Sequence, residues 1–114
     1  GAKDHGRVNQ IEGKLLPGQK VVVVEDLIST GGSVVQVVNV LREAGANVLG
    51  VVSIVTYGMK KGLEKLASEN IKNISLTDFD NIIDVAAEKG YIEEQDKARL
   101  IAFRNNPSDE SWIV

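Results

Sequence analysis

Two long apolar runs separated by a stretch with helical spacing dominate the pattern of hydrophobic and polar residues. The runs cover Val21 to Val24 and Val48 to Val55. Such runs predict strands buried on both faces, as in a parallel sheet covered by helices. Between them, four apolar residues follow the i, i+3, i+4, i+7 spacing of a helix face: Val34, Val37, Val38 and Leu41. Strand, helix and strand over residues 20–55 therefore predict one right-handed βαβ unit.

The rest of the chain continues the alternation of strands and helices. Gly1 to Asn9 has no hydrophobic periodicity and predicts a mobile loop. Short strands are predicted over Gln10 to Leu16 and Asn73 to Leu76. Helices are predicted over Met59 to Glu69 and over Glu93 to Arg104. Between them, a capping pattern at Thr77–Asp80 predicts a helix that ends at Gly90. The fold class expected is α/β with three layers, in which a mostly parallel sheet is flanked by helices.

Composition narrows the class of protein without identifying it. With 114 residues and 43% hydrophobic content, the chain can form one domain with a modest core. A net charge of −3 argues against a general nucleic-acid binder, and no apolar run is long enough to span a membrane. The absence of cysteine excludes a disulfide framework and fits a reducing compartment, so a cytoplasmic protein is expected.

The residues that follow Val24 combine two carboxylates with a segment rich in hydroxyls and glycines. Glu25 and Asp26 come first, and the segment from Ser29 to Ser33 reads Ser-Thr-Gly-Gly-Ser. Open parallel sheets bind ligands at the carboxyl ends of their strands. Glycines allow a tight turn that brings several N–H groups onto one anion, and a helix starting near Ser33 would direct its positive end there. One ligand could bind to both parts of this site if it carried a sugar diol for the carboxylates and a phosphate for the loop.

This pattern closely resembles the phosphoribosyl-pyrophosphate (PRPP) motif of the type I phosphoribosyltransferases. Within that group, Ala-Lys-Asp-His-Gly at positions 2–6 resembles the catalytic loop of the orotate phosphoribosyltransferases, at the right distance upstream. The run Val51 to Gly58 and the tail Glu88 to Trp112 are also similar. Because that family carries a substantial portion before the catalytic loop, the resemblance implies a carboxyl-terminal fragment. Residues 1–12 would then be a remnant of the catalytic lid, and residues 13–114 part of the core.

The resemblance implies transfer of the 5-phosphoribosyl group from PRPP to orotate, which gives orotidine 5′-monophosphate and pyrophosphate in pyrimidine synthesis. Lys3 and His5 would belong to a lid that closes over pyrophosphate in a neighbouring subunit, so a homodimer is implied. Mg²⁺ would arrive with PRPP, and no metal-binding residue is assigned. The other implied contacts are Glu25 and Asp26 for the ribose, with Asp26 catalytic; Thr30, Gly31, Gly32 and Ser33 for the 5′-phosphate; and Ser29 for PRPP and the orotate ring.

Two departures limit the transfer of these roles. The earlier basic residues of the lid would precede Gly1, so the fragment alone is expected to be inactive. Many family members also have an arginine for the orotate carboxylate just after the strand that ends near Val55, where this chain has Thr56-Tyr57-Gly58. Lys60 and Lys61 follow but are expected on the solvated face of a helix. The residue that binds the orotate carboxylate is therefore left unassigned.

Three other functions share parts of this pattern. A purine phosphoribosyltransferase would carry the same PRPP loop, but Lys3-Asp4-His5-Gly6 disfavours it. A non-catalytic PRPP-sensing regulator would be expected to carry a DNA-binding module elsewhere. A receiver domain also has an acidic pair after its first strand, but it needs a phosphoacceptor aspartate for which Asp78 is only a loose candidate.

Overall fold

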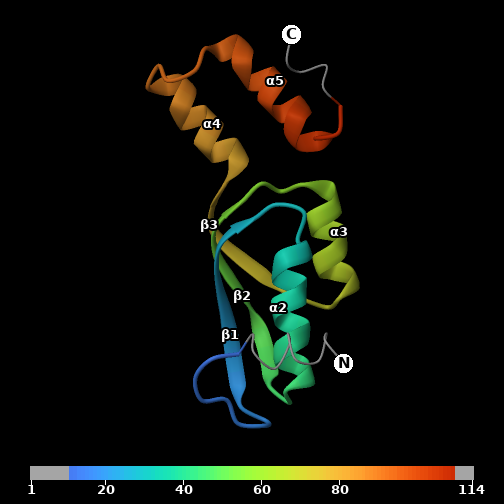
Figure 1. Cartoon of the computed structure of the whole chain (residues 1–114). Helices are drawn as coiled ribbons and strands as arrows, with labels where there is room; N and C mark the ends of the chain where they lie inside the picture. Colours follow the sequence, from blue (N-terminus) through green and yellow to red (C-terminus); the bar gives the residue numbers. More distant parts are fainter. Residues whose placement is uncertain (1–10, 110–114) are drawn as a thin grey trace.

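The structure is a computed structural model, and it describes residues 11–109. Within this range the chain forms a parallel sheet and a set of helices, in the predicted order (Figure 1). The elements are β1 (Lys20–Ile28), α2 (Gly32–Glu43), β2 (Asn47–Thr56), α3 (Lys60–Ser68), β3 (Asn73–Asp78), α4 (Phe79–Glu88) and α5 (Glu94–Asn105). The predicted α/β class and the βαβ unit are confirmed.

The three strands lie in the order β1-β2-β3, and both neighbouring pairs are parallel. Val23 of β1 is in register with Val51 of β2, which is in register with Asn73 of β3. All three strands therefore finish at the same edge of the sheet. That carboxyl edge is where a ligand is expected in a fold of this kind.

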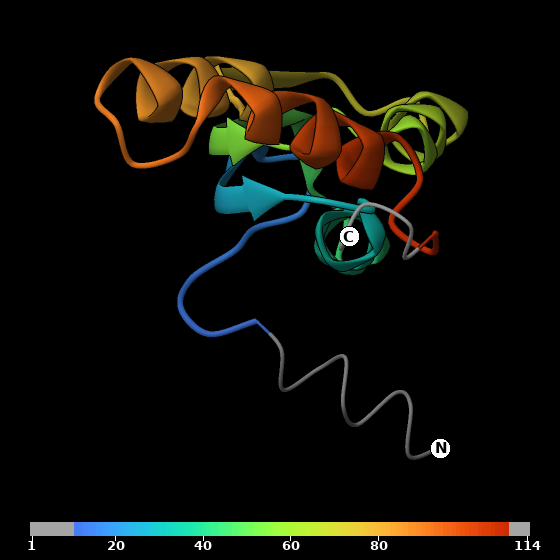
Figure 2. The same ribbon diagram turned by 90° about the horizontal axis from the view of Figure 1, so that it is seen from above.

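Helices α2 and α3 lie side by side against one face of the sheet (Figure 2). The buried core forms between them and that face. It consists of Val23, Ile28, Val34, Val35, Val38, Val51, Leu66 and Ile71. The valines that a propensity scale would assign to a strand, Val34, Val35 and Val38, are buried on α2 because their helical spacing directs them to one side.

The opposite face of the sheet is uncovered in the described part of the chain. Val22 is 50% exposed and Val24 78%, and on β3 Ile74 is 64% and Leu76 77% exposed. The prediction that the valine run is buried on both faces is therefore wrong here. The reason lies in the topology: two right-handed crossovers in the order β1-β2-β3 place both connecting helices on the same side.

The segment before β1 also departs from expectation. Within the predicted strand of residues 10–16, the described residues 11–16 form no strand. Gly13 has a φ of 101°, and a turn follows in which the Gln19 N–H donates to the Leu16 carbonyl (3.1 Å). Both features bend the backbone out of the extended conformation. The turn predicted at Pro17-Gly18 is confirmed.

Helices α4 and α5 form a pair beyond the carboxyl edge of the sheet (Figure 1). The side chain of Asp78 caps α4 by accepting a hydrogen bond from the Asn81 N–H (2.9 Å). The cap is thus one residue later than the predicted Thr77, because β3 continues through Asp78. Among the described helices, none is both long and apolar enough to cross a bilayer.

The uncovered face leads to a prediction about association. We expect the 114-residue chain to self-associate with increasing concentration, because exposed contiguous apolar surface favours burial against another molecule. The double substitution Val24→Lys and Ile74→Lys should shift the chain towards monomer, as measured by sedimentation velocity. Lys substitution at two exposed positions outside the sheet, Gln36 on α2 and Glu88 on α4, serves as the control. Equal association of the two double variants would contradict the prediction.

Candidate functional site at the carboxyl edge

The acidic pair lies inside β1, with two residues of the strand still to follow. Glu25 is in register with Ser53 of β2, and pairing continues to Ile28. Consecutive residues of a strand project to opposite faces. In agreement with this, Glu25 is partly buried on the side of the helices, whereas Asp26 is exposed. The sequence placed both carboxylates at the strand end, but the structure separates the directions in which they point.

The loop after β1 is short, and its conformation depends on one glycine. Gly31 is buried and has a φ of 83°, a left-handed conformation that residues with a Cβ rarely adopt. Helix α2 begins at the next residue, Gly32, one position before the predicted start. Ser29 is partly buried, while Thr30 and Ser33 are exposed. One exposed hydroxyl of the loop and one of the first turn of α2 thus lie at this end of the helix.

The amino-terminal end of α2 is free to bind an anion. No side chain caps it, and its first turn contains no acidic residue. The first N–H groups of a helix lack partners within the helix and carry a partial positive charge. The first N–H with such a partner is that of Val35, which donates to the Gly31 carbonyl (3.0 Å). The N–H groups just before it are those that a phosphate could accept from.

Helix α3 packs directly on this loop through a residue without a side chain. A Cβ at Gly62 would lie 2.5 Å from the Ser29 carbonyl oxygen. A Cβ at Gly31 would in turn lie 3.5 Å from the Gly62 Cα. The backbones of the loop and of α3 are therefore in contact. Sequence reasoning missed Gly62, although a glycine inside a helix is unfavourable by about 1 kcal/mol and could have drawn attention to it.

On the far side of the loop, the segment after β2 is tied to α4 and α5. The guanidinium of Arg104 donates to both carboxylate oxygens of Asp80 (2.9 and 3.1 Å) and to the Tyr57 carbonyl (3.2 Å). The ring of Tyr57 lies 5.2 Å from that of Phe79. Arg104 thus reaches the position where the family resemblance led us to look for an arginine. Sequence gave no signal for this contact, since 47 residues separate the partners.

Arg104 acts here as a structural clamp. Its Nε donates to Asn105 Oδ1 (2.8 Å), so most of its donors are engaged within the chain. The two hydrogen bonds to Asp80 also neutralise its charge. A guanidinium satisfied in this way holds the Tyr57 segment against the helical pair and has little capacity left for a ligand carboxylate.

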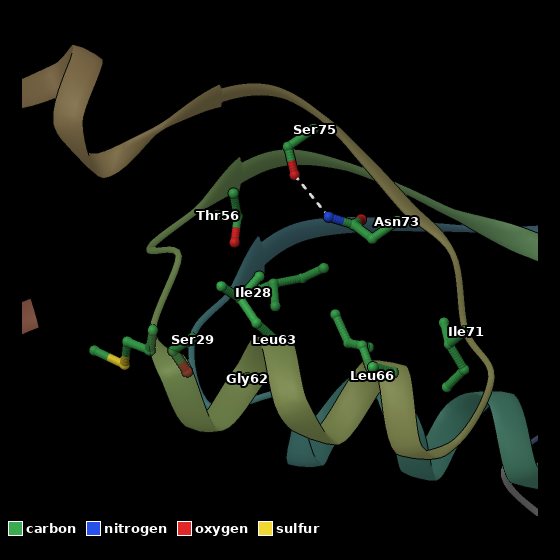
Figure 3. A pocket seen from close by; sticks show the side chains of 11 residues that line it. Ile28, Ser29, Thr56, Gly62, Leu63, Leu66, Ile71, Asn73 and Ser75 are labelled. Atoms are coloured by element: carbon green, nitrogen blue, oxygen red, sulfur yellow. Dashed lines mark hydrogen bonds between the residues drawn. The ribbon is translucent and has the colours of Figure 1, made fainter. Parts of the chain in front are cut away.

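A cavity of about 350 Å³ lies between α3 and the sheet (Figure 3). Apolar side chains of α3, including Leu63 and Leu66, form one wall. On the opposite wall the Asn73 side chain donates to Ser75 Oγ (2.9 Å), which also contacts the hydroxyl of the buried Ser53. These polar groups already satisfy one another, and no charged residue lines the cavity. It therefore offers no cation for an anionic ligand.

Within the described residues, no group of three or more His, Cys, Asp or Glu side chains could hold a metal ion. Mg²⁺ does not require such a group, because it commonly binds through one or two carboxylates together with phosphates and water. Because their side chains project to opposite faces, either Glu25 or Asp26 could supply one such carboxylate. Lys3 and His5, the predicted lid residues, lie outside the described residues.

Comparisons with known proteins agree with this fold. Residues 4–89 match the model of the phosphoribosyl transferase domain. The chain is 56% identical over 113 residues to an orotate phosphoribosyltransferase of Bacillus cereus. The matched residues make up 99% of this chain and 54% of that relative.

Two solved structures are also similar. Leishmania donovani UMP synthase has a TM-score of 0.72 and 26% identity over 81% of this chain and 20% of that one. A Mycobacterium tuberculosis orotate phosphoribosyltransferase in complex with PRPP has a TM-score of 0.55 and 30% identity over 62% and 42% of the two chains.

The chain belongs to the phosphoribosyl transferase domain family, because the family model covers most of its length. It spans about half the length of the curated relatives that it matches. The family assignment and the α/β fold are thus established for the chain itself, whereas the activity of a whole protein of this kind requires a proposal.

The contact between α3 and the loop gives a testable prediction. Gly62→Ala should lower the free energy of unfolding by about 1–3 kcal/mol, because the added methyl group overlaps the Ser29 carbonyl. This loss should occur even though alanine is the better helix former by about 1 kcal/mol. Gly32→Ala is the matched control, since a Cβ there would meet only the Lys65 Nζ, at 4.0 Å. Urea denaturation measures both variants, and a Gly62→Ala protein as stable as the parent would refute the close contact.

Proposed function

We propose that the chain forms the PRPP-binding half of an orotate phosphoribosyltransferase. The observation that carries this proposal is the uncapped amino-terminal end of α2, reached through a glycine-rich loop at the carboxyl edge of the sheet. The 56% identity to proteins named orotate phosphoribosyltransferase supports orotate over a purine as the acceptor. A relative of this family that was solved with PRPP supports the donor.

In this proposal the loop binds the 5′-phosphate of PRPP. The N–H groups of Gly32 and its neighbours donate to the phosphate oxygens, and the hydroxyls of Thr30 and Ser33 add further donors. Ser29 lies at the start of the loop, beside the place where the base would stand. The positive φ of Gly31 sets the turn that brings these groups together.

The carboxylates are proposed to act on the ribose. Transfer passes through a ribosyl centre with developing positive charge, which a nearby carboxylate stabilises. Asp26 is exposed on the uncovered side of β1, whereas Glu25 points towards the helices. On the family resemblance we assign the catalytic role to Asp26 and a supporting contact with the ribose to Glu25. Mg²⁺, bound with PRPP, would neutralise the charge of the departing pyrophosphate.

The rest of the enzyme is proposed from the family resemblance. Lys3 and His5 would come from a lid that covers pyrophosphate in the partner's site, so the whole protein would be a homodimer. We propose a cytoplasmic enzyme, in agreement with the absence of cysteine. Without the portion of the family that this chain does not span, we expect PRPP binding by the chain to be weak and turnover to be absent.

The phosphate loop can be tested by binding alone. Gly31→Val should abolish PRPP binding by the chain, because a β-branched residue resists a φ of 83° and fills space beside the loop. Gly90→Val is the matched control: its φ is 79°, and nothing lies within 4 Å of an added Cβ. Both variants should be destabilised by about 1–2 kcal/mol, but only the first should lose binding in calorimetry. Parent-like affinity of Gly31→Val would place the phosphate elsewhere.

The role of Asp26 can be tested by kinetics in a protein extended to the full length of its relatives. Asp26→Asn should lower kcat on the order of tenfold to a hundredfold with a smaller change in the KM for PRPP, since the carboxylate acts mainly on the transition state. Glu25→Gln, which removes the same charge from the other face, should have a smaller effect on kcat. A change confined to KM for Asp26→Asn would refute the assignment. Turnover with adenine or hypoxanthine and none with orotate would favour the purine alternative.

A further inference from the structure

The side chain of Lys65 on α3 lies beside the two glycines of the phosphate loop. Its Cβ is 3.8 Å from the position that a Cβ at Gly31 would occupy, and its Nζ is 4.0 Å from that of a Cβ at Gly32. The same lysine borders two hollows on either side of the loop, one with Thr30 and one with Gly32. An exposed lysine of α3 is thus brought to the start of α2.

The position of this ammonium group is electrostatically unusual. The start of α2 is positive, has no side-chain cap, and has no acidic residue in its first turn. Among the described residues, Lys65 has no ion pair, whereas Lys60 on the same helix pairs with Glu64 (3.9 Å). Two adjacent positive groups repel each other unless an anion lies between them. A bound phosphate would remove this repulsion and satisfy both.

The close approach is possible because of Gly62. Residues 62 and 65 are three positions apart and therefore lie on the same face of α3. Since Gly62 has no side chain, that face can touch the Ser29 carbonyl. The contact holds α3 at a fixed distance and carries Lys65 to the loop. Glu43 and Glu69 border the hollow at Gly32, and Glu64 borders the hollow at Thr30. A phosphate would compete with these carboxylates for the ammonium.

We propose that Lys65 is a further phosphate-binding residue of this site, and that its ammonium group bonds the 5′-phosphate of PRPP from the α3 side. This inference rests on the proposed function, since it takes the loop after β1 as the phosphate site. Lys65 supplies a full positive charge and the α2 backbone supplies directed N–H groups. Both act on the same phosphate and neither acts on the pyrophosphate.

The test compares three ligands on the 114-residue chain by calorimetry at low salt: ribose 5-phosphate, PRPP with Mg²⁺, and pyrophosphate with Mg²⁺. Lys65→Gln should raise the Kd for ribose 5-phosphate and for PRPP by a similar factor of about five, the upper range for one exposed charge contact. The Kd for pyrophosphate should not change. Lys65→Arg should restore most of the affinity, because it keeps the charge.

Lys60→Gln is the matched control, because it removes the same charge from the same helix at a residue that borders neither hollow. It should leave all three Kd values unchanged. Parent-like binding of ribose 5-phosphate by Lys65→Gln overturns this inference alone, as does an equal weakening for pyrophosphate, which would indicate general attraction of anions. Failure of the parent chain to bind either phosphoribosyl ligand overturns the proposed function and this inference with it.

Discussion

The contact between the backbone of α3 and the loop after β1 determines how the candidate site is built. At Gly62 there is no room for even one carbon atom beside the Ser29 carbonyl. The loop is therefore held between the end of β1 and the side of α3. Its other constraint is the left-handed conformation of Gly31, which turns the chain into α2. Together these two glycines fix the conformation of the loop from which α2 begins.

The one-sided sheet follows from the same chain order. Right-handed crossovers place α2 and α3 on one face, which buries the core and brings α3 against the loop. The cost of this arrangement is an apolar face that the described residues do not cover. The chain spans about half the length of its relatives, and this half contains the glycine-rich loop after β1 and the helix that supports it.

The pair of helices after β3 has a separate link to the carboxyl edge. Arg104 connects α5 to Asp80 at the start of α4 and to the Tyr57 carbonyl after β2. The side chain of Arg104 is only 14% exposed, which strengthens these charge-assisted hydrogen bonds relative to those on an open surface. As a result, the segment after β2 is held by a residue 47 positions away in the chain, whereas the loop after β1 is formed by consecutive residues and supported by α3.

The sequence by itself determined the order and type of the elements and the location of the candidate site. Apolar runs specified β1 and β2, helical spacing specified α2, and the glycines after Asp26 marked the loop before α2, because each signal is local and depends on a few consecutive residues. Tertiary structure decided what depends on distant neighbours. It left Val24 on an open face, separated the directions of Glu25 and Asp26, and placed Gly62 and Lys65 against the loop. No local pattern reports which helix packs beside a loop some thirty residues away along the chain, because that choice follows from the handedness and order of the strand connections.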